Sequence, residues 1–148
     1  MAETMALSKI LHIRENEKKN AQRVYHQSIE FFENIATQLY NLLKKKEAAE
    51  DSYELYLKET TPIDKIKEQV IYIELLNNQI MSLQNDVQKA RTDMENNQEK
   101  LTSAFVEVKK FEKIIEYRHK EKEEMIKKND NALMDETSIQ QYLSQKHR

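Results

Sequence analysis

The sequence predicts an all-α protein: a long antiparallel two-helix coiled-coil hairpin with a short C-terminal helical tail. Three observations predict this class. The 148 residues include no glycine and only one proline, so the residues that favour turns and bends are nearly absent. Charged residues make up 34% of the chain, and its mean hydropathy of −0.88 is too polar for a thick core. Apolar residues recur at alternating steps of three and four, which is the spacing of a coiled-coil seam.

The first helix is predicted over residues 3–59. Its seam positions follow one another at steps of three and four for more than thirty residues. These seam residues are Tyr25, Ser28, Phe32, Ile35, Leu39, Leu42, Lys46, Ala49, Tyr53 and Tyr56.

The only proline separates the first helix from the second, which is predicted over 62–129. A proline inside a helix costs about 3 kcal/mol, whereas the first helical position tolerates it. Thr61 is therefore expected to cap the second helix, with Pro62 at its first position and Asp64 near the positive end of its dipole. The turn occupies 60–61.

The second helix has a clearer seam than the first. Its d positions are apolar in eight consecutive heptads: Ile66, Ile73, Ile80, Val87, Met94, Leu101, Val108 and Ile115. The a positions lie three residues earlier in each heptad, and four consecutive ones in the middle of the helix are polar. The full set is Ile63, Val70, Asn77, Gln84, Arg91, Gln98, Phe105 and Glu112. Polar a residues weaken a coiled coil but help to fix its register.

Two such helices joined by a short turn fold back on each other, so 1–134 is expected to form one antiparallel hairpin. Residue i then lies near about residue 121 − i, which places Arg91 opposite Glu30 and Lys45 near Leu76. The second helix, on the order of 100 Å long, is expected to extend beyond the first, which is on the order of 80 Å long.

The last segment, 135–148, is predicted as a separate short amphipathic helix. Asp135 or Thr137 is expected to cap it, and Ile139, Tyr142 and Leu143 share one of its faces. This tail is either a frayed end or a docking segment for a partner.

The sequence offers no site for chemistry, so we expect no catalytic residue, cofactor or metal. Nucleotide-binding loops need glycine, and thiolate chemistry needs cysteine, which is also absent. None of His12, His26, His119 and His147 has a second histidine three or four residues away. The net charge of −2 gives no general attraction to nucleic acid, and no apolar run reaches the roughly 18 residues of a membrane span. The N-terminus lacks the pattern of a signal peptide, and a cytoplasmic protein is expected.

Two stretches of the second helix are candidate binding surfaces. Between Lys109 and Lys128 there are eight basic residues against five glutamates, which favours either a solvated face or contact with an acidic partner. Further upstream the helix is apolar nearly all round. One flank there is expected to lie outside the seam, and either self-association, a bent first helix or another protein covers it. This flank is Tyr72, Leu76, Gln79 and Leu83.

Three stretches form a combination typical of one family: the opening LSKILHIRENEKKNAQRVY from Leu7 to Tyr25, the region from Glu68 to Ile80, and the run EVKKFEK from Glu107 to Lys113. Together with the sequence Met-Asp-Glu at 134–136, the chain length and the position of the hairpin turn, they resemble the FliJ family. Tyr72 stands where the family often has an aromatic residue.

The resemblance implies a component of the bacterial flagellar protein-export apparatus that acts as a non-enzymatic stalk-like coupler. The implied partners are the export ATPase ring and its regulator, the cytoplasmic domain of the export gate, and substrate chaperones. The implied location is the cytoplasm, peripheral at the inner face of the membrane, and the free chain is expected to be a monomer. The gate is assigned to Tyr72, Leu76, Gln79 and Leu83, and the ring to Lys113, Arg118, Lys120 and Lys122. The alternatives are a self-associating scaffold or holdase, and the equivalent stalk protein of a type III injectisome.

Overall fold

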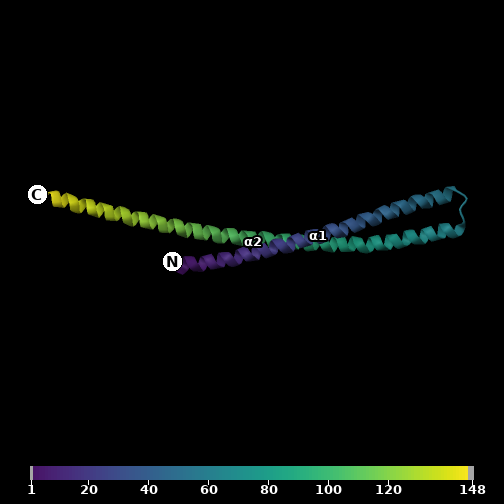
Figure 1. Ribbon diagram of the computed structural model, residues 1–148, viewed down its shortest axis with the longest axis horizontal. Helices are drawn as coiled ribbons and strands as arrows, with labels where there is room; N and C mark the ends of the chain where they lie inside the picture. Colours follow the sequence, from purple (N-terminus) through teal and green to yellow (C-terminus); the bar gives the residue numbers. More distant parts are fainter. Residues whose placement is uncertain (1, 147–148) are drawn as a thin grey trace. The chain divides into compact units, whose positions relative to one another are not determined.

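The computed structural model describes residues 2–146 and consists of two long helices joined by one short turn (Figure 1). Helix α1 spans Ala2–Lys58 with 57 residues, and helix α2 spans Ile63–Lys146 with 84 residues. The described part of the chain contains no strand. The predicted helical hairpin class is therefore confirmed.

Pro62 caps α2 from one position outside the helix. Its carbonyl accepts hydrogen bonds from the backbone N–H of Lys65 at 3.1 Å and of Ile66 at 3.4 Å. This is the role of an N-cap residue, so α2 begins one residue later than predicted and Thr61 lies just outside the cap. No residue from 2 to 146 has a positive φ, so the turn forms without the conformation for which glycine is favoured.

The predicted seam of α1 is confirmed. Every one of its ten residues from Tyr25 to Tyr56 is shielded from solvent at least in part, and Ser28, Ile35 and Ala49 are buried. Ser28 keeps its hydroxyl satisfied by donating to the carbonyl of Tyr25 at 2.7 Å. The steps of three and four in the sequence therefore correspond to one face of α1.

Of the two heptad columns predicted for the seam of α2, the d column is confirmed and the a column is wrong. Residues of the predicted d column are shielded throughout, with Ile80 and Val108 buried. The predicted a column is mostly exposed, including Val70, Arg91 and Phe105. The second column instead lies three residues after each d position: Gln69, Leu76, Leu83, Ala90, Asn97, Ala104 and Phe111. The polar middle expected for the seam is thus reduced to a single buried asparagine, Asn97, at 7% exposure.

The helices form two compact units. The hairpin unit is Lys19–Ser103 and contains the turn, and the terminal unit combines the residues up to Lys18 with those from Ala104 onward. In the hairpin unit, the side-chain amide of Gln69 donates to the carbonyl of Ala49 at 2.9 Å. This bond ties α1 to α2 close to the turn.

The two helices are antiparallel within each unit. In the hairpin unit the Arg91 guanidinium lies 5.8 Å from the centre of the Phe32 ring. In the terminal unit Arg14 Nε lies 4.0 Å from Glu107 Oε2, and Arg118 forms an ion pair with Glu3. These pairs agree with the predicted register, in which residue i lies near about residue 121 − i.

Helix α2 does not end near residue 129, and the segment from 135 to 146 is not a separate helix. The helix is continuous to Lys146. The Thr137 hydroxyl donates to the carbonyl of Leu133 at 2.9 Å, a bond inside a helix, so Thr137 does not act as a cap. Asn129 and Asn131 each cost less than about 0.7 kcal/mol in a helix, and no proline or glycine follows Pro62 to stop it.

Candidate docking surfaces

The described residues contain side chains suited to binding and no group of side chains arranged for metal chemistry. No cluster of three or more histidine, aspartate or glutamate side chains that would hold a metal occurs in residues 2–146. His26 and His119 each lie beside a glutamate one turn later on the same helix, Glu30 at 3.6 Å and Glu123 at 3.7 Å. His147 lies outside the described residues. In the same range, neither helix has a stretch apolar enough to cross a bilayer.

The predicted flank on α2 is divided between the core and the surface. Leu76 is 3% exposed and Leu83 is partly covered, so both belong to the second seam column. Tyr72 is 43% exposed, and Gln79 is exposed. The expectation that all four lie outside the seam is therefore wrong, because the seam column was assigned one residue out of place. Tyr72 and Gln79, seven residues apart, remain on one side of α2 and are accessible to a partner.

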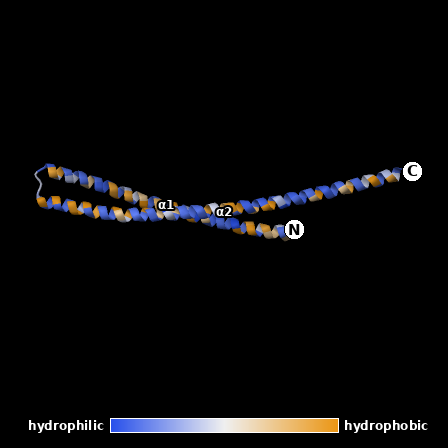
Figure 2. Cartoon of the chain, turned by 180° about the vertical axis from the view of Figure 1, so that it is seen from behind, coloured by the Kyte–Doolittle hydropathy of each residue, from blue (hydrophilic) through white to orange (hydrophobic). Residues whose placement is uncertain are grey.

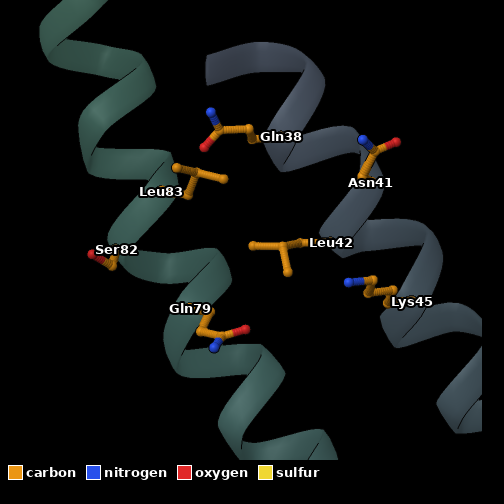
Figure 3. A pocket seen from close by; sticks show the side chains of 7 residues that line it. All are labelled: Gln38, Asn41, Leu42, Lys45, Gln79, Ser82 and Leu83. Atoms are coloured by element: carbon orange, nitrogen blue, oxygen red, sulfur yellow. The ribbon is translucent and has the colours of Figure 1, made fainter. Parts of the chain in front are cut away.

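A groove between the helices of the hairpin unit lies beside Gln79 (Figure 3). Its volume is about 450 Å³. Leu42 of α1 and Leu83 of α2 point toward each other across it, and polar side chains surround them. The groove thus combines an apolar contact with amide and hydroxyl groups that can both donate and accept hydrogen bonds. Its remaining lining residues are Gln38, Asn41, Lys45, Gln79 and Ser82.

The α1 side of this groove was missed by sequence reasoning. The predicted register already places Leu42 opposite Gln79, and Gln38 opposite Leu83. The predicted flank contained residues of α2 only, so it did not include the neighbouring residues of α1. The signal was therefore present in the register, although neither helix has a motif that marks the groove.

The outward face of α2 near the turn is apolar and accessible. Ile63 is 69% exposed, Ile71 is 65%, Leu75 is 53% and Met81 is 64%. These side chains do not contribute to the seam that holds the hairpin together. Helix α2 near the turn therefore carries apolar residues outside the seam as well as in it, and α1 does not cover this face.

All four residues of the predicted basic surface are exposed, and Arg118 is the one that forms an ion pair within the described residues. Lys113, Lys120 and Lys122 are exposed, and none of them forms an ion pair with a residue in 2–146. Arg118 is paired with Glu3 of α1, so the part of α2 that extends beyond the first helix begins only after Arg118. Residues 119–146 are exposed.

The C-terminal part of α2 carries apolar side chains among its polar residues (Figure 2). Ile139 is 61% exposed, Tyr142 is 64% and Leu143 is 49%. Met125 and Leu133, at 68% and 66%, extend this apolar character toward the α1 contact. The three residues singled out in the sequence therefore belong to a longer face of a continuous helix.

Comparison with known proteins gives a match along nearly the whole chain. A family model described as "Flagellar FliJ protein" matches residues 3–147. The curated flagellar FliJ protein of Bacillus subtilis (strain 168) is 36% identical over 151 residues, which cover 99% of this chain and 100% of that protein. No solved structure matches the chain significantly.

Proposed function

The chain belongs to the FliJ family of flagellar proteins, and we propose that it serves flagellar protein export as a coiled-coil coupler without catalytic activity of its own. In this role it contacts the export ATPase ring and its regulator, the cytoplasmic domain of the export gate, and substrate chaperones. The observation that carries the proposal is the family match over residues 3–147, because the surfaces assigned below all lie within it.

The ATPase ring is assigned to the basic surface of the terminal unit. Lys113, Lys120 and Lys122 are exposed and free of ion pairs within 2–146, so their charge is available to an acidic partner. Arg118 contributes to the same surface once its contact with Glu3 is exchanged for one with the partner. Such contacts promote encounter and orientation more than they raise affinity.

The export gate is assigned to the side of the hairpin unit that carries Tyr72, Gln79 and the neighbouring groove. A tyrosine combines a large apolar surface with a hydroxyl, which makes it a frequent anchor at interfaces. The groove presents the apolar side chains of Leu42 and Leu83 to a partner and offers amides at its edge. Leu76 supports this surface from the core and does not itself reach a partner.

The gate assignment is tested with a Tyr72→Ala, Gln79→Ala variant of the full chain. Binding to the purified cytoplasmic domain of the gate and secretion of flagellar subunits in a strain lacking the gene are measured together. Both should fall, and Tyr117→Ala, which changes a more exposed tyrosine in the terminal unit, should leave both unchanged. Normal binding by the double variant would refute the gate surface. Normal secretion in the strain with no copy of the gene would refute the export role itself.

A self-associating scaffold or a holdase remains the second candidate function. The observation that favours it is the apolar outward face of α2 formed by Ile63, Ile71, Leu75 and Met81, which a client helix or another copy could cover. The two functions differ in what the chain needs: a holdase suppresses aggregation of unfolded clients without the ATPase or the gate. An injectisome stalk is the less favoured variant, because the matching family is flagellar.

The proposed place of work is the cytoplasm, with attachment to the inner face of the cell membrane through protein partners. A gate contact would bring the chain to the membrane without any membrane-spanning segment of its own. Cell fractionation tests this: loss of the gate surface should shift the chain from the membrane fraction to the cytosolic fraction.

A further inference from the structure

The first part of α1, residues 2–18, is held against α2 by few contacts within the terminal unit. None of the residues 2–18 is buried, and the stretch of α2 in this unit that lies beside them, 104–118, has one buried residue, Val108. A segment with so little buried apolar surface separates at a lower free-energy cost than a packed core. The large apolar side chains of the two stretches that are partly covered are Leu7, Ile10 and Leu11 on α1, and Phe111, Ile114 and Ile115 on α2.

Arg14 is poorly satisfied in this contact. Its Nε is buried and has no hydrogen-bond partner among residues 2–146. That atom lies 4.0 Å from Glu107 Oε2 of α2, beyond hydrogen-bond distance, whereas Nη1 donates to Glu17 on α1 itself at 3.0 Å. The guanidinium lies 5.8 Å from the centre of the Phe111 ring, near the outer limit of a cation–π contact. A buried donor without a partner destabilises the closed contact, and separation of the helices would return it to water.

An ion pair at the free end of α1 closes the contact. Glu3 of α1 pairs with Arg118 of α2, and the two side chains are 68% and 43% exposed. The pair lies at the end of the stretch that α1 covers, because residues 119–146 are exposed. An exposed ion pair contributes little stability and is open to competition from other charges. A carboxylate of a partner can therefore replace Glu3 without displacing any buried group.

We propose that residues 2–18 form a strap that opens from α2 while the hairpin unit stays folded, and that an acidic partner promotes the opening by taking Arg118 from Glu3. The hairpin unit has buried side chains of its own, such as Ile35 and Ile80, so its folding does not depend on the strap. The strap follows from contacts within the chain. Only the identification of the acidic partner with the ATPase ring rests on the proposed function.

Opening of the strap exposes an apolar side of α2. Val108, which is 2% exposed in the closed contact, loses its cover together with Phe111 and Ile115. These residues lie on the same continuous helix as the exposed stretch 119–146, so the uncovered length of α2 in this unit then begins near residue 104. An acidic partner that binds Arg118 thus makes an apolar surface accessible. The coupling is reciprocal, because a partner bound to that apolar surface would in turn free Arg118 from its ion pair.

Distances between spin labels on the two helices test the proposal in the full chain. Labels on cysteines introduced at Met5 and Glu116 report on the strap, and labels at Thr37 and Gln84 report on the hairpin unit. All four positions are exposed, and the antiparallel register places the members of each pair side by side. Double electron–electron resonance should show a short distance and a broad long-distance fraction for the first pair. The second pair should show the short distance alone.

Reversal of either charge of the ion pair should favour the open strap. Glu3→Lys and Arg118→Glu should each raise the long-distance fraction of the first label pair about two- to fivefold, because like charges then face each other. The two substitutions combined in one chain should restore the short distance. Matched controls, Glu95→Lys and Lys89→Glu, change the net charge equally but lie in the hairpin unit, and should leave the fraction unchanged. Circular dichroism checks that every variant remains folded.

Poly-L-aspartate serves as the acidic probe. It should raise the long-distance fraction of the natural chain more than sodium chloride of the same ionic strength does, and it should have no further effect on Arg118→Glu. A natural chain whose strap is unaffected by poly-L-aspartate would overturn the link to an acidic partner.

Three results would overturn the strap itself. The first is a long-distance fraction that is absent or that Glu3→Lys leaves unchanged. The second is a combined variant that stays open, and the third is equal opening of both label pairs, which would mean that the chain unfolds as a whole. None of these measurements involves the ATPase ring, so their outcome is separate from that of the export role.

Discussion

Tyr72 and Leu76 lie one helical turn apart on α2 but in different surroundings. Leu76 is 3% exposed and packs into the seam, whereas Tyr72 is 43% exposed at its edge. The difference of about one position around the helix decides whether a side chain holds the hairpin together or is free for a partner. A substitution at Leu76 is therefore expected to act on folding, and one at Tyr72 on partner binding.

Leu76→Ala should lower the free energy of unfolding by about 2–5 kcal/mol, because it leaves a cavity in the seam. Tyr72→Ala should lower it by about 1 kcal/mol or less, because its ring is largely at the surface. Thermal and urea unfolding followed by circular dichroism measure both changes. Equal losses of stability would contradict the placement of these two side chains, whatever happens to partner binding.

Part of the candidate site could be predicted from the sequence and part could not. Exposed Tyr72 and Gln79 were expected, because their positions lie outside the strong column of isoleucines and valines. Leu76 and Leu83 were misplaced, because the sequence gives two possible second columns, one on each side of that strong column. The column from Gln69 to Phe111, with two leucines, two alanines and a phenylalanine, is more apolar than the column of Val70, which is polar from Asn77 to Gln98. The sequence therefore contained the signal for the correct column.

At the scale of the helices, the partner helix explains the polar and small members of the second column. Gln69 is polar, yet its amide is satisfied by the carbonyl of Ala49 across the hairpin. Ala90, at 4% exposure, is small enough for the helices to approach closely where a larger residue would not fit. Both facts depend on which α1 residues lie opposite, whereas Leu76, Leu83 and Phe111 mark the same column in the periodicity of α2 alone. The ten seam positions of α1 were correct because that helix has a single shielded face.

The ends of the helices show the same contrast. The break at Pro62 could be predicted because proline acts on its own backbone. The continuation of α2 through Asn129 and Asn131 could not, because asparagine is unfavourable in a helix by an amount too small to end one. Asp135 and Thr137 are residue types that often cap the start of a helix. They would act as caps here only if α2 ended before them and a new helix began.

Asn97 provides a test of the corrected seam. It is 7% exposed in the second column, and its side-chain amide lies 3.5 Å from Asp93 Oδ2 on the same helix. Asn97→Leu should raise the free energy of unfolding by about 1–2 kcal/mol, because an apolar side chain replaces a polar one in the seam. Thermal unfolding measures this gain.

In the same variant, α1 and α2 should pack against each other in a less well-defined register. Cysteines introduced at positions 30 and 91 of this cysteine-free chain should cross-link within one molecule, and Asn97→Leu should reduce the yield by admitting shifted registers. A loss of stability on Asn97→Leu would place Asn97 outside the seam. Predominantly intermolecular products in the natural background would contradict the hairpin.

At the scale of the whole molecule, burial is unevenly divided between the two units. Most of the buried residues, including Ile35, Ala49, Leu76 and Ile80, belong to the hairpin unit. Among the described residues of the terminal unit, only Val108 is buried. Segments with few buried apolar contacts open at lower free-energy cost than the core. The unit assigned to the ATPase ring is thus the one that can rearrange most readily.

Hydrogen exchange should reveal this division. Backbone amides of 119–146 should exchange fastest, those of 2–18 should be intermediate, and those of the seam from Tyr25 to Tyr56 should be slowest. The expected spread is about a hundredfold or more between the first and last groups. Mass spectrometry of peptides from the exchanged full chain measures it at low protein concentration, where self-association is weakest. Uniform protection along the chain would show that the two units open together.

The basic surface of the terminal unit is a local excess of positive charge that the net charge of −2 for the whole chain does not reveal. Lys113→Glu, Lys120→Glu and Lys122→Glu together should weaken binding to the ATPase ring. The loss should be larger at low than at high salt, because exposed charges interact through water and are screened by ions. A control with Lys65→Glu, Lys67→Glu and Lys89→Glu changes the net charge equally but lies in the hairpin unit. Surface plasmon resonance on immobilised rings at two salt concentrations separates the two variants. Equal losses would mean that only total charge matters, and unchanged binding at both salt concentrations would place the ring contact elsewhere on the chain.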